Sequence, residues 1–185
     1  MKKKKIKEIT IIGPGLIGGS IGMGLKKKKI VDKIVGIDIS KKNLQDALKK
    51  KVIDDSRQVI DERISKSEII FVCTPVSSTN DVLENLLPFL SKKNIVTDTG
   101  SVKNIFKKST LKKIISISNF IPGHPVAGTE YSGAKNSMID LFVGKWCILT
   151  PLKQHKLGRK IISELWESLG MKIAIMTSNE HDKIM

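Results

Sequence analysis

Gly13-Pro14-Gly15-Leu16-Ile17-Gly18 follows directly on the isoleucine-rich run Ile6–Ile12 and opens an amphipathic segment. In such a turn the first glycine permits the tight bend, the second lets the backbone approach a pyrophosphate, and the third lets a helix pack closely on the strand. The N-terminus of that helix then faces the phosphates. We therefore predict that a strand, a glycine turn and a helix bind a dinucleotide here.

A second apolar run, Ile34-Val35-Gly36-Ile37, ends in Asp38, twenty residues after Gly18. A carboxylate at this position accepts hydrogen bonds from the ribose hydroxyls of the adenosine and repels a 2′-phosphate. The acid therefore favours NAD over NADP as the cofactor. Lys41 and Lys42 follow closely and leave some use of NADP open.

Short apolar runs alternate with longer amphipathic stretches along the whole chain, which predicts a Rossmann-like, doubly wound α/β fold with a mostly parallel sheet. The predicted strands are Ile6–Ile12, Lys33–Asp38, Glu68–Cys73, Asn94–Asp98, Asn119–Pro122, Lys145–Thr150 and Met171–Met176. The predicted helices are Leu16–Lys28, Lys41–Lys51, Thr79–Leu90, Lys103–Ile115 and His155–Leu169.

We expect one dinucleotide-binding domain over residues 1–177, followed by the start of a helical domain over residues 178–185. The stretch after Met176 predicts a helix start, with Ser178 or Asn179 as the cap and acidic residues in the first turn. The sequence ends about one turn later, and so short a helix is not stable alone. We therefore expect the chain to be a fragment of a longer protein.

The formal net charge of +15 raises the hypothesis of a nucleic-acid-binding protein. Almost all of the positive residues are lysines, however, and they are scattered over nearly every predicted helix, while arginines and aromatic residues are scarce. A nucleobase reader needs both. We therefore expect a lysine-rich solvated surface that binds no nucleic acid but attracts an anionic substrate.

No apolar run approaches the roughly 18 residues that span a membrane, and the basic stretch Met1–Lys5 carries no signal-peptide pattern. We therefore expect a cytoplasmic protein without membrane contact. Cys73 and Cys147 are far apart, lack metal-ligand spacing and are expected to be buried free thiols. No metal site is expected.

The third strand ends in Cys73-Thr74-Pro75, which we expect beside the cofactor at the carboxyl edge of the sheet. Thr74 and Pro75 are therefore candidate cofactor-binding residues. A structural alternative stays open, in which Pro75 begins a loop and Ser77-Ser78 cap the next helix.

Two further strands bring Ser101 and His124 to the same edge. Removing a hydride from a carbon that bears a hydroxyl requires a group that takes the hydroxyl proton, and neutral histidine suits that task near pH 7. We place Ser101 at a helix N-terminus, where it would bind the same oxygen or a substrate carboxylate. His155 is expected to be exposed, whereas His181 is expected either to cap its helix, to orient a neighbour or to reach the cleft.

These motifs resemble the prephenate/arogenate dehydrogenase family. The specific stretches are Asp98-Thr99-Gly100-Ser101-Val102-Lys103 and Gly123-His124-Pro125-Val126-Ala127-Gly128-Thr129-Glu130, with the glycine loop, Thr74-Pro75 and His181-Asp182 in support. The resemblance implies NAD-dependent oxidative decarboxylation of prephenate or arogenate in tyrosine biosynthesis. It implies that His124 takes the proton of the 4-hydroxyl and that Ser101 orients His124 and the substrate.

The resemblance also implies that Thr129, Glu130 and Ser132 line the substrate mouth, although a purely structural turn stays open for all three. Family members carry a helical C-terminal domain that dimerises and contributes a basic residue to the substrate's carboxylate. A homodimer is therefore expected for the full-length protein. Two alternatives stay open, namely an NAD-binding regulatory module without turnover and a β-hydroxyacid or imine reductase of the same fold.

Overall fold

The computed structural model describes residues 5–151 and 155–185. Residues 1–4, which belong to the stretch expected to carry no signal peptide, therefore lie outside the described part. Its main feature is a six-stranded, wholly parallel sheet in the order β3-β2-β1-β4-β5-β6. The strands are β1 (Ile6–Ile12), β2 (Val31–Ile37), β3 (Asp55–Arg57), β4 (Ile69–Val72), β5 (Ile95–Asp98) and β6 (Asn119–Phe120). This order confirms the doubly wound fold, with its topological switch between β1 and β4.

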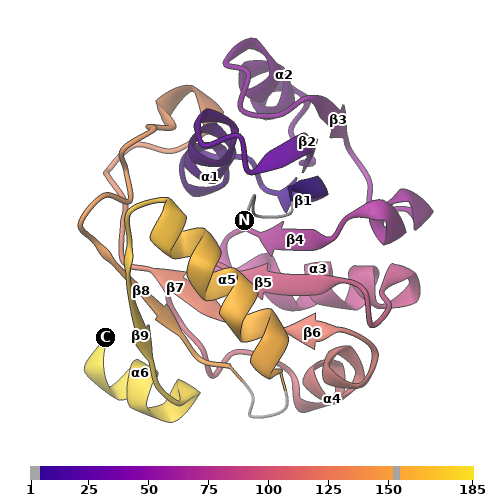
Figure 1. Ribbon diagram of the computed structural model, residues 1–185. Coiled ribbons are helices and arrows are strands. Elements are labelled where there is room, and N and C mark those ends of the chain that lie inside the picture. The colour runs from indigo at the N-terminus through magenta and orange to yellow at the C-terminus, as the bar shows by residue number, and fades with distance from the viewer. Residues whose placement is uncertain (1–4, 152–154) are drawn as a thin grey trace.

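Helices cover both faces of this sheet, and Figure 1 shows α5 in front of it with α3 behind. The α-helices are α1 (Leu16–Lys27), α2 (Lys41–Lys49), α3 (Thr79–Leu86), α4 (Lys108–Ile117), α5 (Lys156–Ser168) and α6 (Ser178–Ile184). Short 3-10 turns are η1 (Glu62–Lys66), η2 (Val76–Ser78), η3 (Leu87–Phe89) and η4 (Ala134–Asn136).

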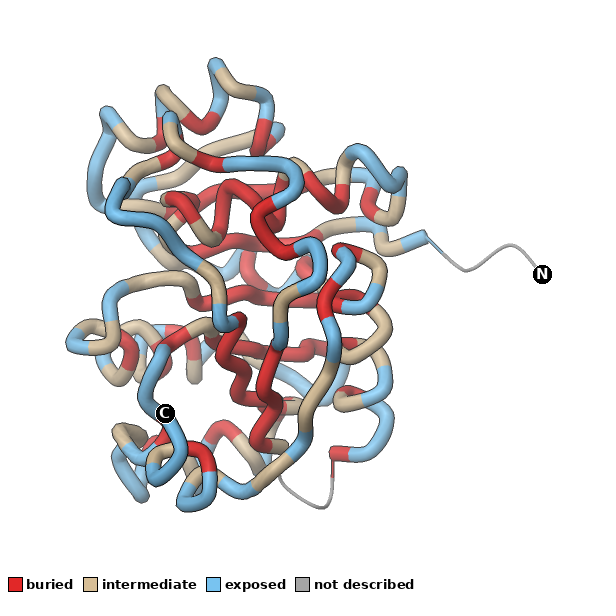
Figure 2. The backbone as a smooth tube through the Cα atoms, turned by 90° about the vertical axis from the view of Figure 1, so that its left-hand side faces the viewer, coloured by how far each residue is buried: buried red, intermediate tan, exposed pale blue. Residues whose placement is uncertain are grey.

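The isoleucine-rich strands are buried on both faces because the helices pack against each side. In β1, Ile9 and Ile11 join a core with α1, α2 and α5, whereas Ile12 joins a second core with α3 and α4. Figure 2 shows the resulting continuous burial along the central strands. Burial on both faces is the reason that these strands read as apolar runs rather than as alternating patterns.

A separate three-stranded sheet lies beside the first (Figure 1) and consists of β7 (Gly123–Pro125), β8 (Trp146–Leu149) and β9 (Lys172–Ile175). β7 runs antiparallel to β8, and β9 runs parallel to it. The predicted strand Asn119–Pro122 stops before His124, but His124 lies within β7 and pairs with Ile148. Both β7 and β3 were missed because three residues, with glycine and proline in one case, carry no strand pattern of their own.

The helix predicted from Lys103 begins instead at Lys108, so Ser101 does not lie at a helix N-terminus. The intervening residues stay in a loop because Lys103 uses both its backbone N–H and its side chain in tertiary hydrogen bonds. The last helix begins as predicted, but its cap is Thr177, which forms a capping box with Glu180. That cap replaces the predicted Ser178 or Asn179.

Within the described ranges, 5–151 and 155–185, no helix is both long and apolar enough to cross a membrane.

Gly18 tests how tightly α1 packs on β1. A Cβ at this position would lie 2.5 Å from the carbonyl oxygen of Gly13 and 2.7 Å from Cγ2 of Ile11. We expect Gly18→Ala to lower the free energy of unfolding by about 1–3 kcal/mol, because overpacking forces backbone and side chains apart. Urea denaturation measures this loss in the free energy of unfolding. The matched control is Gly128→Ala, where a Cβ meets no atom within 4 Å and a change below about 0.5 kcal/mol is expected; equal losses in both variants would contradict the packing argument.

Candidate active site

A cleft of about 1260 Å³ opens at the carboxyl edge of the parallel sheet, where β1 and β4 meet. Ligands of doubly wound proteins bind at this switch point. The volume exceeds that of a pocket for a single drug-sized molecule, so the cleft has room for a dinucleotide and a small ring. The predicted site residues that line it are Gly13, Gly15, Leu16, Ile17, Asp38, Thr74, Pro75, Ser101, His124 and Ser132.

The glycine loop turns sharply at Gly13, whose φ is +80°. A Cβ there would lie 2.8 Å from the carbonyl oxygen of Cys73, so both the backbone angle and the space require glycine. A Cβ at Gly15 would have no neighbour closer than 3.9 Å, so the backbone at Gly15 is open toward the cleft. Pro14 and Gly18 do not line the cleft, since Pro14 packs near Gly36 and Gly18 packs against β1.

Asp38 directly follows β2 and lines the cleft, with its carboxylate held in place. Oδ1 accepts a hydrogen bond from the backbone N–H of Ser40 at 2.8 Å, and Oδ2 accepts one from Nδ2 of Asn43 at 2.6 Å. Oδ1 of Asn43 in turn accepts the N–H of Ala134 at 2.9 Å. Asn43 therefore joins the acid to the first residue of η4. The sequence reasoning missed Asn43, because nothing in the local pattern links it to Ala134.

Thr74 and Pro75 lie at the end of β4, as expected from the third strand. The hydroxyl Oγ1 of Thr74 is buried and has no hydrogen-bond partner within the described residues. Since buried hydroxyls are nearly always bonded, this oxygen is free to bind a ligand in the cleft. Pro75 also begins the turn η2, whereas Ser78 makes no side-chain cap for α3.

A buried ion pair lies beneath the two segments that carry Ser101 and His124. Nζ of Lys103 lies 2.5 Å from Oδ2 of Asp98 and donates to the carbonyl of Gly123 at 2.6 Å. The Asp98 carboxylate also accepts the N–H groups of Gly100 at 2.9 Å and Gly123 at 3.2 Å. Both side chains are almost fully buried. The pair therefore fixes the residues directly before Ser101 and before His124.

His124 lies on β7 with only 9% of its surface exposed, and it lines the cleft. Burial, followed by the charges of His181 and Lys103, lowers the pKa of His124 to about 4, against the opposing effect of Asp182. The imidazole is therefore neutral at pH 7 and is able to accept a proton. Ser101 is exposed at the same cleft.

His181 is the neighbour that sequence reasoning could not assign. It is fully buried on α6, and its Nε2 lies 2.9 Å from Nδ1 of His124. Its Nδ1 lies 2.6 Å from Oδ1 of Asp182. Of the three predicted alternatives, His181 contacts a neighbour, whereas Thr177 caps the helix.

Asp182 is anchored to the loop after β5. Its oxygens accept the backbone N–H groups of Lys103 at 2.8 Å and Asn104 at 2.7 Å. Burial raises the pKa of Asp182, but the hydrogen bonds from His181 and from these two N–H groups outweigh it and lower the pKa below its ordinary value. Asp182 is therefore a carboxylate at pH 7.

The segment after His124 meets the expectations only in part. Ser132 lines the cleft, whereas Thr129 and Glu130 do not. The hydroxyl of Thr129 accepts the N–H of Tyr131 at 3.2 Å, and Glu130 is exposed. For Thr129 and Glu130 the geometry agrees with the alternative that they belong to a purely structural turn. The aromatic ring that sequence reasoning missed is Tyr131, which lines the cleft.

The expectation that His155 is exposed was wrong. His155 is 7% exposed, and its Nδ1 lies 3.2 Å from the backbone N–H of Phe120. It therefore supports β6, outside the cleft lining. Cys147 is buried and Cys73 partly so, and both are free thiols. Within the described residues no group of three or more His, Cys, Asp or Glu side chains could hold a metal ion.

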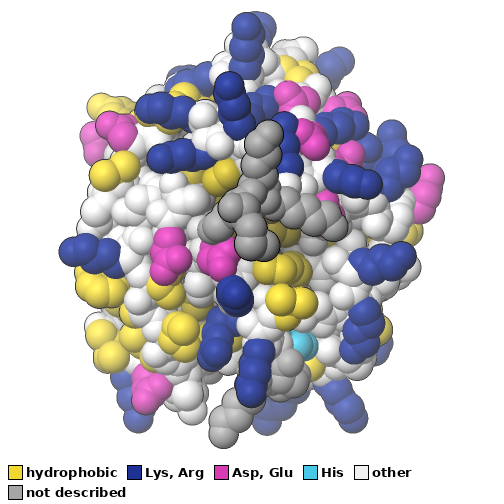
Figure 3. Space-filling view, in the orientation of Figure 1, with side chains coloured by type: hydrophobic (Ala, Val, Ile, Leu, Met, Phe, Trp, Pro, Cys, Tyr) yellow, Lys and Arg dark blue, Asp and Glu magenta, His cyan; other side chains and the backbone are white. Residues whose placement is uncertain are grey.

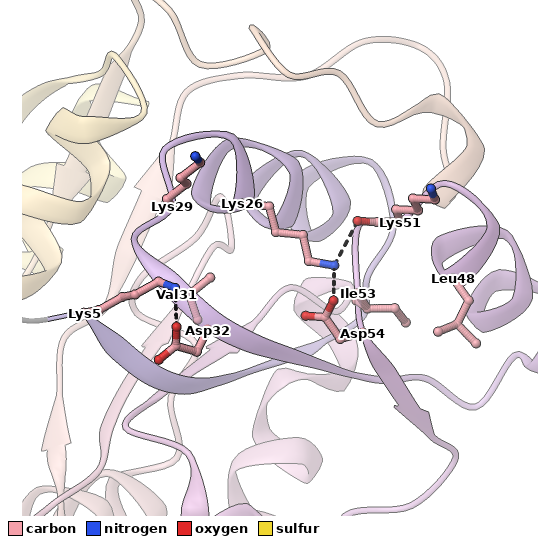
Figure 4. A pocket seen from close by; sticks show the side chains of 9 residues that line it. All are labelled: Lys5, Lys26, Lys29, Val31, Asp32, Leu48, Lys51, Ile53 and Asp54. Carbon is pink, nitrogen blue, oxygen red and sulfur yellow. Dashed lines mark hydrogen bonds and ion pairs between the residues drawn. The ribbon is translucent and has the colours of Figure 1, made fainter.

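A second hollow lies at the opposite, amino edge of the sheet and is lined by lysines (Figure 4). Nζ of Lys26 lies 2.5 Å from Oδ1 of Asp54 and 3.0 Å from the carbonyl of Lys51, and Lys5 pairs with Asp32. These pairs offset part of the positive charge. We assign no ligand to this hollow.

Lys103→Met tests whether the buried ion pair holds the site together. The variant leaves Asp98 buried without a counter-charge, so we expect it to lower the free energy of unfolding by about 3–5 kcal/mol. The matched control is Lys107→Met, which removes an exposed pair with Glu84 at 3.0 Å and should have a far smaller effect. Denaturant unfolding of both variants measures the difference, and similar losses would argue against a special role for Lys103.

Comparison with known proteins identifies the family of this chain. The chain is 33% identical to the prephenate dehydrogenase of Bacillus subtilis over 178 residues, covering 95% of the chain and 48% of that protein. The structure matches a prephenate dehydrogenase from Aquifex aeolicus in complex with hydroxyphenyl propionate and NAD+, with a TM-score of 0.90 and 30% identity, over 99% of this chain and 64% of that one. It also matches the Synechocystis arogenate dehydrogenase with a TM-score of 0.86 and 31% identity, over 96% of this chain and 62% of that one.

The chain thus spans about half the length of the curated relative and less than two thirds of these two structures. The family described as "Prephenate dehydrogenase, nucleotide-binding domain" matches residues 21–175. This match decides against the β-hydroxyacid or imine reductase alternative. The chain belongs to the family of prephenate dehydrogenase nucleotide-binding domains.

Proposed function

We propose that this chain binds NAD and that its complete protein catalyses the oxidative decarboxylation of prephenate or arogenate. The observation that carries the proposal is the neutral imidazole of His124, which lines the same cleft as the glycine loop. A nucleotide site and a proton acceptor in one cleft are the two requirements for removing a hydride from an alcohol carbon.

The cofactor part of the proposal is supported by three features of the cleft. Gly15 leaves its backbone open beside the N-terminus of α1, which suits a pyrophosphate. Asp38 presents an oriented carboxylate to a ribose. The hydroxyl of Thr74, which has no hydrogen-bond partner within the described residues, follows β4, the strand between β1 and β5 in the sheet. The Aquifex aeolicus relative was solved in complex with NAD+.

In the proposed reaction, the C4 hydrogen of the cyclohexadiene leaves as hydride, and bound NAD supplies the acceptor. His124 takes the proton of the 4-hydroxyl as the carbon–oxygen double bond forms. The bond to the ring carboxylate then breaks, carbon dioxide leaves, and the electron pair of that bond makes the ring aromatic. The His124 imidazolium returns its proton to the phenolate oxygen, so the base is regenerated.

Ser101 and Ser132 are the polar side chains of the cleft that we propose to bind the substrate. We propose Ser101 near the hydroxyl or the ring carboxylate, because its loop is fixed by the Asp98 hydrogen bonds. We extend no such role to Thr129 and Glu130, which lie outside the lining.

We further propose a cytoplasmic homodimer that binds no nucleic acid, with a nucleotide-binding domain over residues 1–177 and a helical domain from residue 178. On the face in Figure 3, lysine and arginine side chains are spread among acidic and apolar ones rather than gathered in one patch. Scattered lysines are typical of a solvated surface, whereas a nucleic-acid site concentrates its positive charge.

His124→Asn tests the proposed base. With either prephenate or arogenate and NAD, we expect kcat to fall by about 10²–10⁴-fold, while the Kd for NADH stays within about threefold, because asparagine cannot take the proton. Absorbance of NADH measures turnover in the 185-residue chain and in the complete product of its gene. NADH binding without turnover of either substrate in either form would leave a regulatory NAD-binding module as the better description.

The pH dependence of kcat/KM follows from the lowered pKa of His124. The base acts in its neutral form, so activity is lost as pH falls through the His124 pKa of about 4. For this group we therefore expect a flat profile between pH 6 and 8 in steady-state kinetics with NAD and prephenate. An acid limb near the ordinary histidine value of about 6.5 would argue against a buried neutral His124.

Asp38→Asn tests the choice of cofactor. We expect weaker binding of NADH and tighter binding of NADPH, because the variant keeps the size of the side chain but removes the charge that repels a 2′-phosphate. Fluorescence titration with both nucleotides measures the ratio of Kd values. Asp32→Asn, at the opposite edge of the sheet, is the control and should leave the ratio unchanged.

A further inference from the structure

Three side chains form a continuous hydrogen-bonded row that ends at the cleft. Oδ1 of Asp182 lies 2.6 Å from Nδ1 of His181, and Nε2 of His181 lies 2.9 Å from Nδ1 of His124. Both nitrogens of His181 are therefore used, and its side chain has no exposed surface. The remaining nitrogen, Nε2 of His124, has no partner within residues 5–151 and 155–185, and His124 lines the cleft.

The donors and acceptors in this row have only one arrangement when both imidazoles are neutral. Asp182 is an ionised carboxylate and accepts only, so Nδ1 of His181 carries the proton between them. A neutral imidazole has one donor and one acceptor, so Nε2 of His181 is an acceptor. Nδ1 of His124 must then donate to it. The proton of His124 therefore lies on the nitrogen that faces away from the cleft.

We propose that His181 and Asp182 are positioning residues that hold His124 as the Nδ1–H tautomer, so that its unprotonated Nε2 is the base toward the substrate. This inference rests on the proposed function of His124. When Nε2 takes the hydroxyl proton, Nδ1–H of the imidazolium stays bonded to His181, and the Asp182 carboxylate at the far end of the row favours the positive charge. A triad-like device thus uses a second histidine between the acid and the base.

The charged groups around His181 are compatible with this arrangement. Asp182 lies on α6 beside His181, and His124 lies on β7. Lys103 lies in the loop after β5, and its ammonium group pairs with Asp98 at the end of that strand. Burial raises the pKa of the Cys147 thiol on β8, so that group is neutral.

Two substitutions at His181 separate tautomer control from packing. His181→Phe keeps a ring of similar size but offers no acceptor to Nδ1 of His124, so we expect kcat to fall at least about a hundredfold, with KM and the Kd for NADH little changed. His181→Gln places an amide oxygen near the former Nε2, and we expect it to recover kcat to within about tenfold of the wild-type value.

The matched control is His155→Phe, the same change at another buried histidine that binds the backbone of Phe120 outside the cleft lining. It should leave kcat and the pH profile unchanged. A wild-type kcat in His181→Phe, or equal losses in the Phe and Gln variants, would overturn the proposal.

Nitrogen-15 NMR of the imidazoles tests the tautomer without any turnover. At pH 7 we expect Nδ1 of His124 to be protonated and Nε2 to be unprotonated, with this preference lost in His181→Phe. Wild-type His124 protonated on Nε2 would overturn the inference. If neither substrate is turned over, the proposed function fails, and the NMR result still decides whether His181 sets the tautomer.

Discussion

The buried contact between Lys103 and Asp98 holds together segments that the chain otherwise keeps apart. The ammonium group bonds the acid at the end of β5 and the carbonyl of Gly123 at the start of β7. The backbone N–H of the same lysine bonds Asp182 on α6. One residue therefore fixes the parallel sheet, the small sheet and the last helix relative to one another. Removing two charges from water is costly, and the network is favourable only because its hydrogen bonds are nearly complete.

This network also explains why the catalytic candidate lies on a strand. His124 extends a short sheet whose register is set by β8, while the residue before it is bonded to Asp98 from the large sheet. The imidazole is consequently held from both sides, and its outer nitrogen faces the cleft. Groups that act in catalysis need this kind of support, because a displacement of about 1 Å lowers the rate strongly.

The two ends of the cleft are built on different physical grounds. At the nucleotide end, backbone geometry determines whether a ligand can bind. The positive φ of Gly13 and the open space at Gly15 allow a ligand to approach the main chain. At the catalytic end, burial is the main factor, since it is the largest cause of the lowered pKa that keeps His124 neutral. The asymmetry suits a cofactor that must bind firmly and a base that must change its charge.

From the sequence alone, the fold class, most strands and helices, the glycine turn, Asp38 and the placement of His124 near it could be predicted. Each of these rests on a pattern within about 30 residues, where strand and helix periodicity and the spacing of the βαβ unit are visible. The predicted strand Ile6–Ile12 agrees residue for residue with β1.

The sequence could not determine the contacts that prepare His124. His181 meets it from 57 positions away, and Asp182 meets Lys103 from 79 positions away. It also missed the three-residue strands β3 and β7, the late start of α4 and the burial of His155, because pairing and tertiary hydrogen bonds rather than local propensity decide them. The sequence by itself thus determined a nucleotide-binding fold with a histidine at its cleft. Only the packing of α6 against the small sheet decided which nitrogen of that histidine is free. The reason is that a hydrogen-bonded row between separate elements exists only in the folded chain.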